Sequence, residues 1–226
     1  EDIYGDALEY YYDGDVETAY YGDPYDITPY LNGFALTDTA FNVVRYISEQ
    51  KVYTIVGSGK AGYQDGESIK TAFNGPTGIT TDDEGNLYVA DTQNNVIRKV
   101  DTTGTVTTFA GTTKAGYKDG AADAAQFNQP TGLDWEDGAL YVCDTGNHRI
   151  RKVENGQVTT FAGTAGHYLE SDGIYEGGYQ DGAAAMAQFE SPMDVLVYGN
   201  TVYVADSGNS AVRAIRNGVV STTIIN

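Results

Sequence analysis

The sequence is poor in residues on which many protein classes depend. It contains one cysteine among 226 residues, Cys143, which excludes an intramolecular disulfide framework. Its two histidines are too few for a zinc site built from three histidines. Apolar runs are only a few residues long, so a helix that spans a bilayer is excluded as well.

Basic residues are also scarce. The chain has 13 Lys and Arg against 32 Asp and Glu, and 13 − 32 gives a net charge of −19. Such a charge repels phosphate groups, so nucleic acids and anionic membrane surfaces are poor candidate partners. An RNA-binding function would need a basic face, and the composition argues against one.

Glycine and tyrosine are plentiful, with 28 and 19 residues, whereas methionine occurs only twice. This balance is typical of a β protein rich in turns. The chain is long enough to bury a sizeable core without disulfides.

Four segments of the chain repeat one pattern, in which a proline follows an aromatic residue by three positions. The prolines are Pro24, Pro76, Pro130 and Pro192. An aspartate comes later in each segment, with an arginine seven residues after it. These pairs are Asp38 with Arg45, Asp91 with Arg98, Asp144 with Arg151, and Asp206 with Arg213. A Tyr-x-Asp-Gly sequence precedes each segment, and its aspartates are Asp13, Asp65, Asp119 and Asp181.

The repeat predicts one domain over residues 11–226, preceded by an acidic leader at residues 1–10. Its four units lie at about 11–57, 63–111, 117–163 and 179–226. Extra residues at 166–177 lengthen the last connection and are interpreted as a loop insertion.

Each unit contains short apolar stretches separated by Gly, Asn and Asp. In the second unit, residues 87–90 and 96–100 flank an Asp-Thr-x-Asn turn, and a Val-Thr-Thr-Phe strand ends the unit. One such sheet cannot bury both of its faces, so the units must pack against one another. We therefore predict an all-β fold, a β-propeller of four-stranded antiparallel blades. A closed four-bladed ring is favoured over a fragment of a six-bladed one.

Three stretches, LYVADTQNNVIRKV, LYVCDTGNHRIRKV and VYVADSGNSAVRAI, resemble NHL repeats. The first unit departs from this pattern, because Phe41 replaces the turn asparagine and GFALTD stands in place of LYVAD. It is assigned by spacing. The resemblance implies a propeller, and NHL propellers usually carry six blades, of which four are visible in this sequence.

The repeated Asp, Asn and Arg residues invite two interpretations. The favoured one is structural: Asp and Asn stabilise a turn, and Arg pairs with the aspartate to fix the blade. The alternative is catalysis, but every blade carries these residues. The Tyr-x-Asp-Gly aspartates are interpreted as turn residues, with Ca²⁺ binding as the alternative. Phe73, Phe127 and Phe189 are expected to fill the gaps between blades.

The central tunnel of a propeller is the usual place for a ligand. Asp26 and Asp194 lie two positions after their prolines, and Asp134 lies four positions after its own. These carboxylates are candidates to hold Ca²⁺ or to share a proton; the alternative is that they bond the local backbone. No other cofactor is expected. His148 is interpreted as a solvent-facing turn residue, and Cys143 as a core residue.

The first 44 residues contain ten acidic residues and no basic ones. Tyrosines cluster there too, and tyrosine is common in recognition surfaces. The candidate binding residues are Tyr10, Tyr11, Tyr12, Asp13, Asp15, Tyr20 and Tyr21. The alternative is that the tyrosines repack a degenerate first blade.

The sequence contains no evident nucleophile–base pair or cluster of metal ligands. We therefore expect a non-catalytic recognition or scaffold module for a protein or glycan partner. The alternative is a propeller hydrolase or lyase of the lactonase or amidating-lyase kind, with a cation in the tunnel. The amidating lyase implies a zinc held by histidines, for which two histidines do not suffice.

A secreted or cell-surface location is expected from the composition, although no signal peptide is recognised in these residues. A monomer is favoured, with a dimer through exposed edge strands as the alternative.

Overall fold

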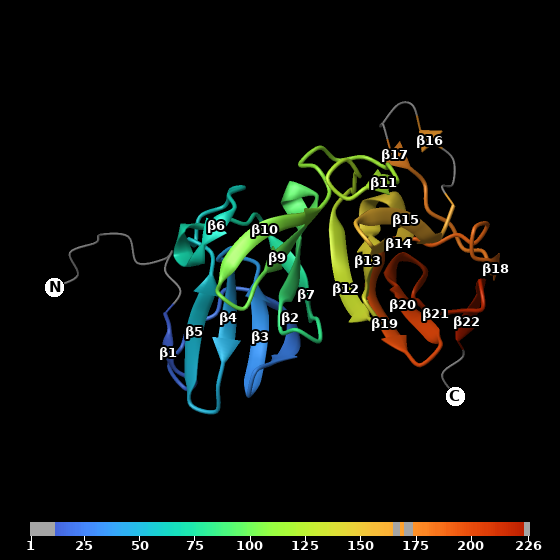
Figure 1. Cartoon of the computed structure of the whole chain (residues 1–226). Helices are drawn as coiled ribbons and strands as arrows, with labels where there is room; N and C mark the ends of the chain where they lie inside the picture. The colour runs from blue at the N-terminus through green and yellow to red at the C-terminus, as the bar shows by residue number, and fades with distance from the viewer. Residues whose placement is uncertain (1–11, 165–167, 170–173, 224–226) are drawn as a thin grey trace.

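The computed structural model describes residues 12–164, 168–169 and 174–223, and in them the chain folds into β-sheet. Four antiparallel sheets of five strands each follow one another along an arc (Figure 1). The helices in these ranges are single 3-10 turns, and none is long or apolar enough to cross a membrane. The predicted all-β architecture is confirmed.

Each sheet is built from one unbroken stretch of sequence. The first sheet contains β2 (Pro24–Tyr30), β3 (Gly33–Asp38), β4 (Val43–Ile47), β5 (Lys51–Val56) and β1 (Gly14–Asp15). The second contains β7 (Pro76–Thr81), β8 (Leu87–Asp91), β9 (Val96–Val100), β10 (Thr105–Ala110) and β6 (Gly66–Glu67). The third contains β12 (Pro130–Glu136), β13 (Ala139–Asp144), β14 (Arg149–Glu154), β15 (Gln157–Ala162) and β11 (Gly120–Ala121). The fourth contains β19 (Pro192–Tyr198), β20 (Thr201–Asp206), β21 (Ala211–Arg216), β22 (Val219–Thr223) and β18 (Gly182–Ala183).

The predicted four strands per blade are present, but a fifth strand lies at the outer edge. It comes from the Tyr-x-Asp-Gly segment, which we expected to form only a turn. In the first sheet, Gly14 pairs with Val52 and Asp15 with Lys51. This strand is two residues long and begins with glycine, so it has no alternation of apolar and polar residues that could reveal it.

The Asp-Thr-x-Asn turns form short 3-10 helices in the last three sheets. They are η2 (Thr92–Asn94), η3 (Thr145–Asn147) and η4 (Ser207–Asn209). The residue after each turn, Asn95, His148 or Ser210, has a left-handed backbone with φ of 57°, 55° and 52°. A further turn, η1 (Ser68–Lys70), lies in the second unit. The predicted insertion contains a small hairpin of β16 (Tyr168–Leu169) and β17 (Ile174–Tyr175).

The apolar core lies between neighbouring sheets. Fully buried Phe73 belongs to a cluster with Val44 of the first sheet and Leu87 of the second. Phe127 and Phe189 occupy the same place in the next two clusters. Each blade is therefore stabilised by burying apolar side chains against the blade beside it.

The inner strands β2, β7, β12 and β19 pack against one another in that order. The approach is so close at Gly132 that an added Cβ would lie 2.5 Å from the Cα of Asp194. A threonine hydroxyl bonds the proline carbonyl of the next blade at each junction. These bonds are Thr39 to Pro76 at 2.6 Å, Thr92 to Pro130 at 2.8 Å and Thr145 to Pro192 at 2.7 Å.

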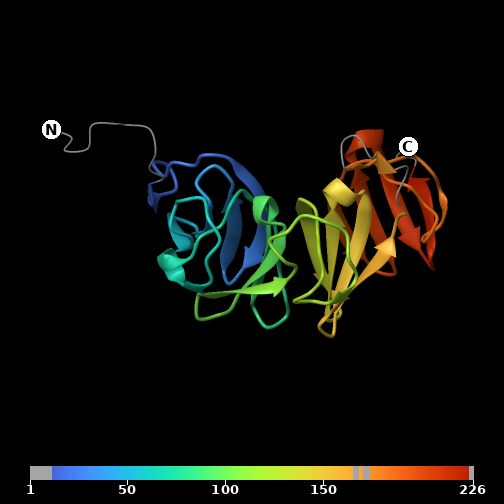
Figure 2. The same cartoon turned by 90° about the horizontal axis from the view of Figure 1, so that it is seen from above.

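The arc formed by the described residues stays open. The first and fourth sheets lie at its opposite ends when the molecule is seen from above (Figure 2). Within these ranges β2 and β19 do not make the packing that joins consecutive inner strands. Because every junction uses the same bonds, each sheet is rotated by a similar angle relative to the sheet before it. Rotations of this size over four sheets do not complete a circle. The closed ring of four blades that we favoured is thus not formed by these residues, and the blade number stays a prediction.

Candidate functional site

The repeated arginines and aspartates form buried ion pairs inside each blade. In the second sheet, Arg98 Nη1 lies 2.7 Å from Asp91 Oδ2 and Nη2 lies 2.6 Å from Asp65 Oδ1. The side chains of Arg98 and Asp91 are completely buried. The guanidinium also lies over the rings of Tyr63 and Phe73, 5.0 Å from each centroid. This confirms the structural interpretation of the Asp and Arg positions.

The same cluster recurs in the other blades. Arg151 Nη1 and Arg213 Nη1 each lie 2.6 Å from the repeat aspartate of their own blade. The pair in the first blade is looser, with Arg45 Nη1 3.7 Å from Asp38. Burial raises the pKa of Asp144, and the charge of Arg151 is the largest effect that opposes the shift.

The Tyr-x-Asp-Gly aspartates also belong to these clusters, because each of them pairs with the arginine of its blade. Asp65 accepts from Arg98 through Oδ1, and its Oδ2 accepts from the backbone N–H of Thr108 at 3.1 Å. Asp119 and Asp181 make the equivalent bonds to Thr160 and Thr222. Their carboxylates anchor the outer strand to the arginine. In the part of the chain that the structure covers, no three His, Cys, Asp or Glu side chains lie together as metal ligands would.

The tunnel aspartates share an electrostatic environment, and each of the three accepts a hydrogen bond from a backbone N–H. Asp26 Oδ2 accepts from Ile79 N–H at 2.9 Å, and Asp134 Oδ2 accepts from Val197 N–H at 2.6 Å. Each of these bonds joins one blade to the next. Asp194 accepts from Val195, its own neighbour, at 2.9 Å. Partial desolvation, together with the charges of Asp26 and Asp134, raises the pKa of Asp194 to about 6.

The candidate residues of the first blade divide into structural and exposed ones. Asp13 accepts from Arg45 at 3.0 Å and from Thr54 N–H at 2.8 Å, as its counterparts do in other blades. Tyr21 lies over the Arg45 guanidinium, 4.7 Å from the ring centroid to Cζ. Asp15 pairs with Lys51 at 2.6 Å on the surface.

Among the tyrosines of this set, Tyr12 and Tyr20 are exposed, at 64% and 55%, and their backbones form one β-bridge. Tyr10 and Tyr11 lie outside the described residues.

His148 has a role that the sequence interpretation missed. Its side chain is largely buried, and Nδ1 accepts from Ser191 N–H of the next blade at 3.0 Å. Asn95 makes the same contact with Gln129 N–H at 2.9 Å. His148 is therefore a junction residue and not merely solvent-facing. Cys143 is fully buried, as expected, and burial raises the pKa of its thiol. His167, the second of the two histidines, lies outside the described residues.

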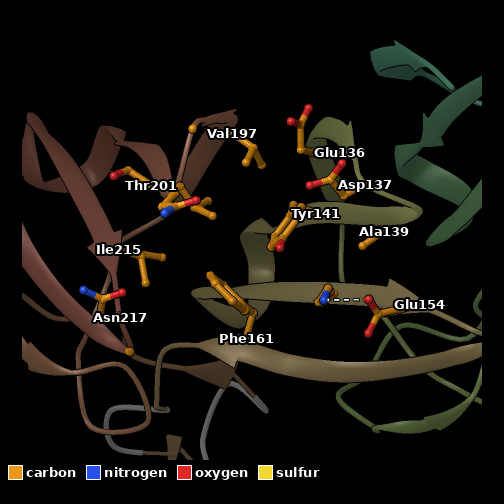
Figure 3. Close-up of a pocket in the computed structure, with 15 residues that line it drawn as sticks. Glu136, Asp137, Ala139, Tyr141, Glu154, Phe161, Val197, Thr201, Ile215 and Asn217 are labelled. Atoms are coloured by element: carbon orange, nitrogen blue, oxygen red, sulfur yellow. Dashed lines mark hydrogen bonds and ion pairs between the residues drawn. The ribbon is translucent and has the colours of Figure 1, made fainter. Parts of the chain in front are cut away.

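A groove of about 480 Å³ separates the third and fourth sheets, and no motif in the sequence pointed to it. The rings of Tyr141 and Phe161 face Val197, Thr201 and Ile215 across it (Figure 3). The two rings meet edge to face, with centroids 5.1 Å apart. The groove combines an aromatic wall with a polar rim, an arrangement typical of small ligand sites.

The NHL repeat family model matches residues 73–99 and 127–153. The chloroplastic protein SUPPRESSOR OF QUENCHING 1 of Arabidopsis thaliana is 40% identical over 97 residues, which are 42% of this chain and 9% of that protein. NHL repeat-containing protein 2 of Gallus gallus is 35% identical over 130 residues, which are 56% of this chain and 17% of that protein. The chain thus corresponds to a small part of these relatives.

Solved structures share the fold at low identity. An auxiliary nutrient binding protein from Bacteroides ovatus superposes with a TM-score of 0.65 at 19% identity, over 89% of this chain and 48% of that one. Virginiamycin B lyase from Staphylococcus aureus gives 0.57 at 16%, over 90% and 56%. A chain of a nidogen/laminin complex gives 0.59 at 19%, over 87% and 60%. The chain thus carries NHL repeats at residues 73–99 and 127–153, and its sheets are blades of a β-propeller.

Proposed function

We propose that the chain is a non-catalytic recognition or scaffold module that binds a protein or carbohydrate partner outside the cell. The observation that carries this proposal is the exposure of large apolar side chains on the first blade, in an acidic setting. They are Tyr12, Val16, Tyr20, Tyr25, Ile27, Leu31, Phe34 and Tyr53. Exposed aromatic groups of this kind mark interaction surfaces.

Two further facts support recognition. The residues repeated in every blade are engaged in ion pairs and junction bonds, which leaves them unavailable for a reaction. Among the proteins of similar fold are a nutrient binding protein and a chain of a nidogen/laminin complex. The extracellular location rests on these neighbours and on the composition, and the acidic charge favours a basic or neutral partner over nucleic acid. A monomer remains the favoured state.

Arrays of glycans and peptides would test the proposal. We expect a Tyr12→Ser/Tyr20→Ser double variant to lose the ligands that the unmodified protein captures, because it removes the exposed rings without touching Arg45 or Asp13. Tyr198→Ser is the matched control, since Tyr198 is 76% exposed on the fourth blade. Equal capture by both variants would show that the first blade is not the binding surface.

A second candidate function is hydrolysis or elimination with a cation such as Ca²⁺ in the tunnel. Its support is the raised pKa of Asp194 beside Asp26 and Asp134, together with the fold shared with virginiamycin B lyase. Metal analysis of the purified protein, followed by assays on lactones and esters before and after chelation, separates the two functions. A stoichiometric metal whose removal abolishes turnover would favour the enzyme.

A further inference from the structure

The groove between the third and fourth sheets has a counterpart between the second and third, where an aromatic ring fills it. There the indole of Trp135 lies flat on Tyr88, with centroids 4.7 Å apart and an interplanar angle of 12°. Phe109 meets Tyr88 edge to face at 4.7 Å. Tyr88 is only 2% exposed beneath this cover.

Val197 stands where Trp135 stands in the preceding blade. Trp135 pairs with Leu140 in the register of β12 and β13, and Val197 pairs with Val202 at the same place in β19 and β20. A valine does not reach across the junction as an indole does. The ring of Tyr141, the counterpart of Tyr88, therefore lines an open groove in place of a stacked pair (Figure 3).

The hydroxyl groups of Tyr88 and Tyr141 also differ, because, among the described residues, one has a hydrogen-bond partner and the other does not. Tyr88 donates to Asp82 Oδ2 at 3.1 Å. In the described part of the chain, the Tyr141 hydroxyl makes no hydrogen bond. The groove thus offers both a ring face and a polar atom whose counterparts are satisfied in the neighbouring junction.

The rim of the groove is acidic. Three carboxylates line it, those of Glu136, Asp137 and Glu154, against the single ammonium group of Lys152. That ammonium is paired with Glu154 at 2.9 Å and lies 5.7 Å from the centroid of Tyr141. The charge that remains favours a ligand with positive charge near its ring.

We propose that this groove binds a planar aromatic ring that carries or adjoins a positive charge, such as a tryptophan beside lysine or arginine in a basic polypeptide. The ring stacks on Tyr141 as the indole of Trp135 stacks on Tyr88, and the cationic group lies at the acidic rim. The inference rests on the proposed recognition function, and it names a ligand class and a second surface for it.

Tryptamine is the probe of choice, with indole-3-propionate as the anionic control and methyl glucoside as the neutral sugar. We expect calorimetry to detect tryptamine and NMR to show shifts of the Val197 methyl groups. Indole-3-propionate should bind at least about tenfold more weakly than tryptamine, because the acidic rim repels its carboxylate. Preference for the glucoside, or equal binding of both indoles, would overturn the proposal.

Two reciprocal variants locate the site. Val197→Trp supplies the missing indole and should abolish tryptamine binding while it raises the melting temperature. Trp135→Val opens the second junction and should create an additional tryptamine site there. If Val197→Trp folds poorly, the Trp135→Val variant still tests the proposal. A Trp135→Val protein that binds tryptamine at one site only, as the unmodified protein does, would contradict it. The Tyr12→Ser/Tyr20→Ser variant should bind tryptamine normally, so failure at the first blade and failure at the groove are distinguishable.

Discussion

Arg151 Nη1 lies 2.6 Å from Asp144 Oδ2, and both side chains are completely buried. Truncating such an arginine leaves an aspartate without its counter-charge inside the protein. We expect Arg151→Met to lower the free energy of unfolding by about 3–5 kcal/mol. Arg151→Lys should also destabilise, because lysine keeps the charge but not the forked geometry. Urea denaturation measures both effects. Arg216→Met, at an exposed position of the next blade, is the control and should have little effect.

The threonine at each junction offers a matched pair. Thr145 donates to Pro192 O and exchanges a hydrogen bond with Thr131, both at or below 2.7 Å. Thr145→Val should cost about 1–3 kcal/mol, because a buried carbonyl loses its donor. Ser207 holds the same position in the last blade, is exposed, and bonds only its local backbone among the described residues. Ser207→Ala should leave the unfolding free energy unchanged. Equal losses in chemical denaturation would mean that the fourth blade also has a partner.

Asp194 should make stability depend on pH between about 4 and 6. Its pKa is 3.8 in the unfolded reference and about 6 in the folded protein, so the folded state favours the protonated carboxyl. Stability from this group is complete below the lower value and is lost as the pH rises through the upper one. Asp194→Asn should therefore raise the melting temperature at pH 7.5 and match the unmodified protein at pH 4. The opposite order in thermal scans would show that Asp194 is stabilised as an anion.

Asp13 and Asp15 should differ although they lie two residues apart in the acidic segment. Asp13→Asn disturbs bonds to Arg45 and Thr54 and should cost about 1–3 kcal/mol. Asp15→Asn removes one surface pair with Lys51 and should change stability by less than about 0.5 kcal/mol. Thermal unfolding of the two single variants decides. Similar effects would assign Asp13 to the surface and not to the blade cluster.

Much of this fold could be predicted because the same residues recur at the same spacing in each of the four units. The spacing of Asp91 and Arg98 indicated a pair, and the structure brings their atoms to 2.7 Å. The antiparallel pairing of the four predicted strands followed from the short turns between them, and the structure pairs these consecutive strands in each sheet. The outer strand was missed because two residues carry no periodic signal.

The groove and the open arc could not be predicted, for a different reason. Both depend on how one blade meets the next, and that relation joins residues far apart in sequence. The exchange of Trp135 for Val197 is visible when the units are aligned, but its effect on Tyr141 requires the register of the neighbouring blade. His148 was misjudged on the same ground, because its partner Ser191 belongs to the following unit.

Among the residues that the structure describes, every sheet draws all of its strands from a single continuous segment, and no strand is borrowed from a distant unit. A genetic duplication or deletion of one whole segment would therefore leave every remaining sheet intact. Only the junction at the affected place would have to be remade, and it uses the same hydroxyl and carbonyl groups each time. Proteins built this way can change length in steps of one blade during evolution. Sequence drift within a junction, as between Trp135 and Val197, changes whether that junction is filled by a ring or left as a groove.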